Sequence, residues 1–292
     1  MVIRRILAAL LVSAVFSTSP CAAQSGGLLP QNATVSVRMR DGSVLVGTLT
    51  EQTTDSVQGT TSGGRLTVAR SAIAEMRVMP AADVHDGTYW APDPHDTRLF
   101  FGPTGRTLER SSGYFSDVYL LILNGAYGIT DRIMLGAGMS VIPFGDFFRD
   151  NLYYLAPKVA LVRGDSFNLA VGALVGFSGR VSGTGTVYYI AATNGRPDAS
   201  FTYGLGYATA GGTVRGDILA MLGGSKRVSR RVALMTENYF LVGRGELNWA
   251  PLYGVRFIGD RLSTDLGFVN YVGHNAKPVF PGVPWLGFAL KF

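Results

Sequence analysis

From residue 98 onward, large apolar side chains alternate with small or polar ones over successive stretches of roughly ten residues. In residues 167–177, one face carries Phe, Leu, Val, Ala, Val and Phe, and the other carries Asn, Ala, Gly, Leu and Gly. Residues 132–141 and 200–208 repeat this pattern. A period of two residues is typical of a β-strand with two unlike faces. The pattern therefore predicts an all-β region.

About twelve strands are predicted in this region. Their expected ranges are 98–103, 114–128, 132–142, 152–163, 167–177, 183–193, 199–209, 212–223, 231–242, 249–258, 261–271 and 284–292. Tight turns at 130–131, 164–165 and 259–260 follow even-numbered strands, whereas the long connections 104–113, 143–151 and 272–283 follow odd-numbered ones. This alternation is typical of an up-and-down barrel with short turns at one end and longer loops at the other.

The small-residue face of these strands is a poor surface for water, because it holds mostly Gly, Ala, Ser and Thr with few charges. It suits the lumen of a barrel whose outer face meets lipid. Backbone groups in lipid have no water to bond, so only a closed sheet satisfies all of them. We therefore expect a transmembrane antiparallel β-barrel over residues 98–292.

The sequence ends in WLGFALKF, with Leu286, Phe288, Leu290 and Phe292 on one strand face. This ending resembles the assembly signal of bacterial outer-membrane β-barrel proteins, a polar-x-Gly-x-x-hydrophobic-x-aromatic pattern, through Gly287, Leu290 and Phe292. It departs from the pattern at Trp285, where a polar residue is usual. The resemblance implies a location in the outer membrane, contact with outer-membrane lipid, and recognition of the last strand by barrel-assembly machinery.

Residues 1–23 have the features of an export signal, with Arg4 and Arg5 before a short apolar core and cleavage expected after Ala23. Residues 33–79 predict about five short strands with a hairpin at Asp41-Gly42. The V-x-V-x-M-x-D-G-S pattern at 35–43, with G-x-L at 47–49 and A-R-S-A-I at 69–73, resembles an Sm-like or SH3-like module. We expect this module in the periplasm, with a possible partner there, and a linker at residues 80–97.

Composition narrows the function classes. The 292 residues include 38 Gly, only 16% charged residues and a single cysteine, Cys21, in the expected signal peptide. The mature chain would then form no disulfide. The formal net charge is +6, and its one cluster, at residues 226–231, is expected to be a solvated turn rather than a nucleic-acid site. His85 and His95 lie near aspartates without metal-ligand spacing, so we expect no metal and no cofactor.

Six charged residues fall on the predicted lumen face, where a charge avoids the cost of facing lipid. They are Lys158, Arg215, Asp217, Glu237, Arg256 and Asp265. They suit either an ion-paired network that fills a narrow barrel or the constriction of a narrow channel. We therefore expect a non-enzymatic structural protein or narrow solute channel.

Two alternatives stay open at this point. The first is a soluble exported β-barrel that binds an apolar ligand. The second is an outer-membrane lipid-processing enzyme that uses Ser263 or His274, although no Gly-x-Ser-x-Gly motif surrounds a serine.

Overall fold

The computed structural model describes residues 29–61, 63–79, 84–85, 88–144, 146–180, 183–211, 213–243, 246–273 and 278–292. The chain divides into two compact units, Met1–Tyr89 and Trp90–Phe292. The expected signal peptide and His274 lie outside the described residues. No helix of the described part is long and apolar enough to cross a membrane.

The first unit contains a five-stranded antiparallel sheet in the order β4-β3-β2-β1-β5. Its elements are β1 (Thr34–Met39), β2 (Val44–Gln52), β3 (Ser56–Thr61), β4 (Gly64–Ala69), a 3₁₀ turn (Arg70–Ala72) and β5 (Ile73–Val78). Val35, Val37, Leu49 and Val57 form its core. A short β6–β7 pair (Val84–His85 and Thr88–Tyr89) follows. The likeness to Sm-like or SH3-like modules stays a prediction.

The expected hairpin joins β1 to β2, but only one of its two central residues has the expected conformation. Gly42 has a φ of +88°, whereas Asp41 is absent from the residues with positive φ. The Asp41 carboxylate instead accepts from the backbone N–H of Ser43 at 2.8 Å. A side-chain bond to a nearby backbone donor is a common way for aspartate to stabilise a turn.

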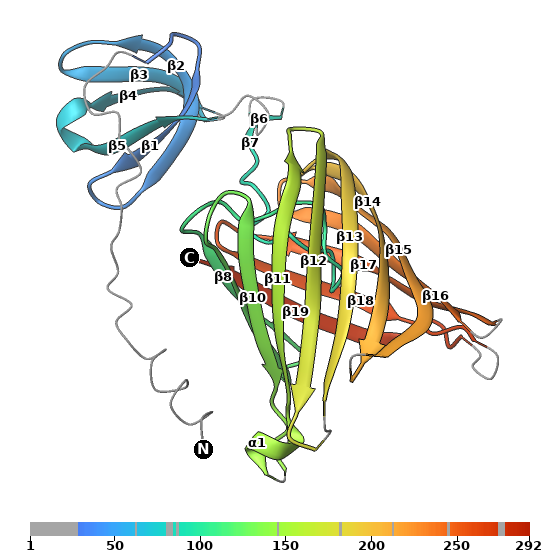
Figure 1. The fold of residues 1–292 in the computed structure, drawn as a ribbon. Helices are drawn as coiled ribbons and strands as arrows, with labels where there is room; N and C mark the ends of the chain where they lie inside the picture. Colours follow the sequence, from blue (N-terminus) through green and yellow to red (C-terminus); the bar gives the residue numbers. More distant parts are fainter. Residues whose placement is uncertain are drawn as a thin grey trace. The chain divides into compact units, whose positions relative to one another are not determined.

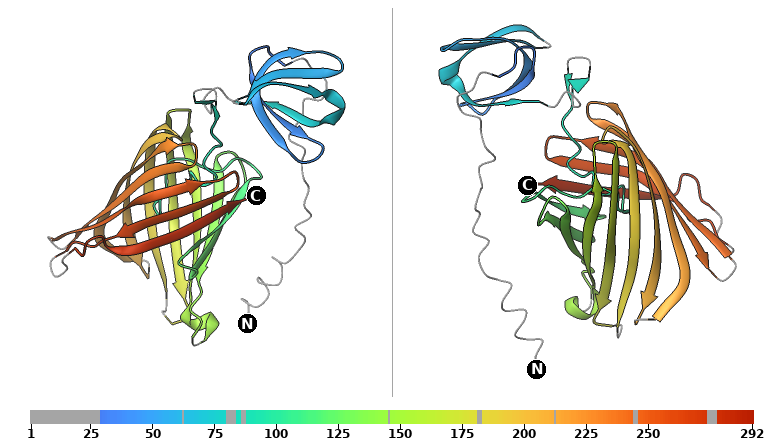
Figure 2. Two further views of the ribbon diagram at one scale, coloured as in Figure 1. Left: turned by 180° about the vertical axis from the view of Figure 1, so that it is seen from behind. Right: turned by 45° about the horizontal axis from the view of Figure 1, so that its top comes forward.

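The second unit is a closed antiparallel barrel of twelve strands, which confirms the predicted fold class. Figures 1 and 2 show the strands side by side around a single lumen. The last strand, β19, pairs with the first, β8, through the register Gly287↔Val118 to Lys291↔Tyr114. The strands are β8 (Gly113–Val118), β9 (Ile122–Gly128), β10 (Ile133–Ser140), β11 (Leu152–Arg163), β12 (Phe167–Ser178), β13 (Thr184–Arg196), β14 (Ala199–Ala210), β15 (Thr213–Ser229), β16 (Val232–Gly243), β17 (Glu246–Ile258), β18 (Leu262–Val269) and β19 (Val283–Lys291).

The predicted number of strands is right, but two of the predicted strands are wrong. Residues 98–103 form no barrel strand; Arg98 and Pro103 make only an isolated bridge. Residues 114–128 form two strands, β8 and β9, because the chain reverses at Tyr119 and Leu120, both with positive φ. The Asp117 carboxylate stabilises this turn by accepting from the Leu120 backbone N–H at 2.6 Å. The two errors cancel in the strand count.

The two ends of the barrel differ in the length of their connections. At one end the strands are joined by short turns, at 129–132, 164–166, 197–198, 230–231 and 259–261. At the other end lie the two longest connections, 141–151, which includes the short helix α1 (Phe147–Asp150), and 270–282. We call these the turn end and the loop end. The expected long connection at 104–113 does not belong to the loop end, where β8 and β9 are joined by Tyr119–Leu121 alone.

Large apolar side chains cover the outside of the barrel and are exposed there. On β14, Leu205 is 57% exposed, while Thr202, on the opposite face of the same strand, is completely buried. Aromatic pairs such as Tyr153–Phe177 and Tyr188–Tyr207 stack towards the loop end. An apolar outer band with aromatic residues near the strand ends is the surface of a membrane-spanning barrel. A soluble protein rarely exposes so extensive an apolar surface.

Candidate functional site in the barrel lumen

Residues 91–108 lie inside the barrel, and we call them the lumen segment. The segment folds as a hairpin: the backbone N–H of Thr104 donates to the Thr97 carbonyl at 3.0 Å, and that of Leu99 donates to the Gly102 carbonyl at 2.9 Å. Its apolar tip is buried, with Leu99 3% and Phe100 1% exposed. Residues 91–97 therefore belong to the barrel, and the expected linker at 80–97 ends before them.

Arg256 of β17 is the largest fully buried side chain among the described residues, and it binds three parts of the lumen segment. Its guanidinium donates to the Asp93 carboxylate at 2.8 Å, to the His95 carbonyl at 2.7 Å and to the Leu99 carbonyl at 2.8 Å. Two further bonds go to Asp265 of the neighbouring strand, at 2.6 and 2.9 Å. All five N–H donors of the guanidinium are therefore used.

Glu237 of β16 binds the tip of the hairpin. Its two carboxylate oxygens each accept one backbone N–H, from Phe101 and Gly102, both at 3.0 Å. Glu237 is fully buried, so these two bonds replace the water that the carboxylate would otherwise need. Arg256 thus binds backbone carbonyls of the segment while Glu237 binds its backbone N–H groups.

The opposite wall of the barrel binds the same segment. Lys158 of β11 donates to the Thr97 carbonyl at 2.9 Å, and Thr193 of β13 accepts from the Gly105 N–H at 2.8 Å. Arg106 of the segment donates to the Gly195 carbonyl at 3.0 Å. Bonds to β11, β13, β16 and β17 fix the segment from two sides of the lumen.

Arg227 of β15 fixes the start of the segment at the turn end. It donates to the Ala91 carbonyl at 2.8 Å and pairs with Asp198 at 3.1 Å. Its guanidinium lies 5.1 Å from the centre of the Trp90 ring. The expectation of a fully solvated cluster at residues 226–231 is therefore wrong for Arg227, although Lys226, Arg230 and Arg231 are exposed.

Close packing of the segment depends on glycine at two positions. A Cβ on Gly105 would lie 2.2 Å from the Asn168 backbone oxygen, and one on Gly102 would lie 2.2 Å from the Met221 sulfur. Such distances are far inside van der Waals contact. At Gly105 the backbone of the segment therefore touches the backbone of the barrel wall directly, whereas at Gly102 it touches the flexible Met221 side chain.

Burial shifts the pKa values of two titratable groups of the segment, His95 and Asp96. Burial, followed by the charges of Arg98 and Arg256, holds the pKa of His95 well below its usual value. The neutral imidazole accepts from Arg98 Nε at 2.6 Å. Burial raises the pKa of Asp96, while the nearby cation Arg106 lowers it.

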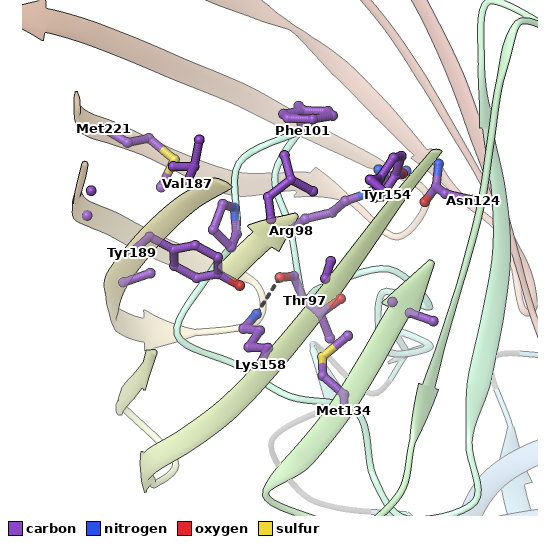
Figure 3. Close-up of a pocket in the computed structure, with 18 of the residues that line it drawn as sticks. Thr97, Arg98, Phe101, Asn124, Met134, Tyr154, Lys158, Val187, Tyr189 and Met221 are labelled. Carbon is purple, nitrogen blue, oxygen red and sulfur yellow. Dashed lines mark hydrogen bonds between the residues drawn. The ribbon is translucent and has the colours of Figure 1, made fainter. Parts of the chain in front are cut away.

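A cavity of about 200 Å³ lies in the lumen beside the segment. Figure 3 shows Lys158, Tyr189, Met134 and Tyr154 of the barrel wall around Thr97 and Arg98 of the segment. Most of its walls are apolar or aromatic. They include Met134, Leu174, Val187, Met221, Tyr154, Tyr189 and Tyr239.

The predicted lumen charges fall into two groups. Lys158, Glu237, Arg256 and Asp265 are buried on the inner side of the barrel, at 0–4% exposure. Arg215 and Asp217 lie in β15, but their side chains are outside the described part of the structure.

The predicted assembly residues lie on or next to the closing strand. Gly287 and Leu290 are on β19, and Leu290 is 48% exposed on the outside. Phe292 bonds Gly113 through both its backbone N–H and its carbonyl.

The lumen segment itself was not foreseen from the sequence. Gly102-Pro103 and Gly105 within residues 98–107 were a usable signal against a strand, because Pro cannot donate to a sheet and Gly weakens one. The apolar run Leu99-Phe100-Phe101 instead favoured a strand.

Comparison with known proteins finds solved structures that resemble the chain only weakly in shape. The solved structures to which it is similar include a loop L8 deletion mutant of OmpT, an outer membrane protein of Vibrio cholerae (13% identity, 89% of this chain and 95% of that chain, TM-score 0.37). Two further structures of OmpT from Vibrio cholerae have TM-scores of 0.34 and 0.31, at 13% and 11% identity. No family model matches the chain, and no curated protein matches it. Similarity this low carries no information about activity.

Proposed function

We propose that the protein is a non-enzymatic outer-membrane barrel that is plugged at rest by its own lumen segment and anchors a periplasmic module. The observation that carries this proposal is the set of buried hydrogen bonds, one of them an ion pair, from charged side chains of the wall to the segment. Arg256 binds Asp93 and two backbone carbonyls, and Glu237 binds two backbone N–H groups. Such bonds are costly to break, since an unpaired buried charge costs about 3–5 kcal/mol.

An outer-membrane location is supported by the apolar exterior and by the closed antiparallel sheet. The chain enters the lumen at the turn end, where Arg227 binds Ala91. Short turns are periplasmic in such barrels. We therefore place the N-terminal module in the periplasm, where a partner protein is possible.

Recognition by the barrel-assembly machinery is proposed for the closing strand, through Gly287, Leu290 and Phe292. Replacement Phe292→Ala should lower the yield of folded barrel in the membrane. The control is Phe280→Ala, because Phe280 lies in the loop before β19 and is 93% exposed. Equal yields of the two variants would contradict this role.

The lipid-processing alternative has less support. Ser263 lies on β18 and is 1% exposed, but its hydroxyl has no hydrogen-bond partner among the described residues. A nucleophilic serine needs an adjacent base to activate it. Among the described residues, no three histidine, cysteine or acidic side chains are grouped as metal ligands.

A narrow solute channel is the second candidate, favoured by the cavity beside the lumen segment. The two candidates differ in what the resting protein conducts. In planar lipid bilayers, a plugged anchor gives no steady conductance, whereas a channel gives discrete open levels without any change to the protein.

The experiment combines fractionation with conductance on the full chain. We expect the protein in the outer-membrane fraction, with a gel mobility that changes on boiling, and no steady conductance at neutral pH. Recovery in the soluble periplasmic fraction would contradict the membrane assignment. Steady open levels in the wild-type protein would contradict the plugged anchor and support the solute channel.

A further inference from the structure

The cavity beside the lumen segment contains a buried lysine that forms no ion pair within 4.0 Å with any carboxylate of the described residues. Lys158 is 3% exposed, and its ammonium makes a single hydrogen bond, to the Thr97 carbonyl (Figure 3). No carboxylate of the described part lies within 4.0 Å of it. An ammonium has three donors, so two of them have no acceptor among the described residues.

A second polar group in the cavity is also unsatisfied. The side-chain oxygen of Asn124 accepts from Ser116 at 2.6 Å, but its buried amide nitrogen has no hydrogen-bond partner in the described part of the chain. The described residues that line the cavity include no aspartate or glutamate. The cavity therefore offers hydrogen-bond donors that lack acceptors.

Structural stability alone does not explain a lysine at this position. Taking an ammonium out of water costs several kcal/mol, and the one hydrogen bond to the Thr97 carbonyl returns only part of that cost. Charged residues within membrane-spanning segments commonly mark sites for ions or ligands. Lys158 faces a cavity, which gives an anion room to bind it.

The remaining walls suit an apolar body. Met134, Leu174, Val187 and Met221 line the cavity, as does Phe101 of the lumen segment. An apolar cavity of about 150 Å³ is known to hold benzene. At about 200 Å³, this cavity has room for a benzene-sized ring and a carboxylate.

We propose that this cavity binds a small aromatic monocarboxylate, with its carboxylate on the Lys158 ammonium and its ring against Met134, Leu174 and Val187. The ligand reaches the site from the loop end, because the lumen segment fills the turn end. This binding goes beyond the proposed function, since a plugged anchor needs no ligand.

The test is isothermal titration of the purified full-length mature chain in detergent with benzoate, and with benzamide as the neutral isostere. We expect saturable one-to-one binding of benzoate and binding of benzamide at least tenfold weaker. Loss of a buried charged partner weakens binding by about thirtyfold or more, so Lys158→Met should bind benzoate correspondingly less. The matched control is Lys226→Met, at an exposed lysine of β15, which should bind like wild type.

A second variant tests the cavity without removing the charge. Leu174→Trp fills the space with a larger ring and should abolish binding of benzoate while Lys158 remains. Heat-dependent gel mobility checks that each variant is folded. Absence of benzoate binding to wild type, equal binding of benzamide, or unchanged binding by both Lys158→Met and Leu174→Trp would overturn the proposal. None of these results depends on whether the barrel conducts ions.

Discussion

Replacing Arg256 by methionine should release the lumen segment. The bonds to Asp265 lie within the barrel wall, so they are present in the plugged and the released state and cancel in the comparison. What differs is the ion pair to Asp93 and the two bonds to the His95 and Leu99 carbonyls. Asp93 would remain buried in the plugged state without its partner.

The expected size of the effect follows from this difference. Removing one partner of a buried pair costs about 3–5 kcal/mol. Since each 1.4 kcal/mol is a factor of ten, the released fraction should rise between roughly a hundredfold and a few thousandfold. Arg256→Lys should have a smaller effect, because lysine keeps the charge but loses the planar five-donor fork.

Two readouts measure the release. Planar-bilayer conductance should show open levels in Arg256→Met that wild type lacks. Maleimide labelling of Thr97→Cys, a site that is 2% exposed, should become fast when combined with Arg256→Met. The natural cysteine, Cys21, does not interfere if the expected signal peptide is removed.

The control is Arg261→Met, at an exposed arginine of the turn before β18. It removes the same charge without touching the segment and should behave like wild type. The reasoning would be refuted if Arg256→Met kept a heat-modifiable barrel and yet showed the same conductance and labelling rate as Arg261→Met.

Three further predictions concern acid, packing and lipid. The pKa of His95 is depressed in the plugged state. The contribution of neutral His95 to plugging is therefore present above about pH 6.5 and is lost as the pH falls below that value. In wild-type protein the conductance should rise between pH 7.5 and 5.5. The raised pKa of Asp96 acts in the opposite direction, so His95→Gln, measured in parallel, should show less of the rise, and an equal rise in both would refute a role for His95. Gly105→Ala places a Cβ 2.2 Å from the Asn168 backbone oxygen and should weaken plugging by about 1–3 kcal/mol. The control Gly185→Ala, where nothing lies within 4 Å of the added Cβ, should leave the conductance unchanged. Equal conductance of the two variants would contradict the packing argument. Leu205→Arg lies in the middle of the outer face of β14 and should lower the free energy of unfolding in lipid vesicles, measured with urea, by about 2–4 kcal/mol. Ala199→Arg at the strand end should lower it by about 0–1 kcal/mol. Equal losses of unfolding free energy would argue against a lipid-facing exterior.

The strand periodicity was sufficient to predict most of the barrel. Residues 167–177 were expected as a strand, and β12 spans Phe167–Ser178. The same alternation indicated which side chains face outward, since a strand has only two faces and one of them holds the large apolar residues. It also put Lys158, Glu237, Arg256 and Asp265 on the inner side, because a charge in lipid is expensive.

The sequence did not reveal the turn between β8 and β9. The chain reverses at Tyr119 and Leu120, which adopt positive φ without glycine or asparagine. Local turn preferences depend on those residue types, so an apolar run through residues 118–123 looked continuous.

By itself, the sequence determined the periodic elements: an alternating chain that closes into a barrel with an apolar outside and a charged, glycine-rich inside. Only the tertiary structure decided what the inner charges bind. An apolar run such as Leu99-Phe100-Phe101 can be buried equally well by lipid outside the barrel or by side chains within it, because burial of apolar surface has no direction. Residues 95–102 lie inside the barrel because the buried charges of Arg256 and Glu237 bind their backbone groups. These partners lie more than a hundred residues apart along the chain.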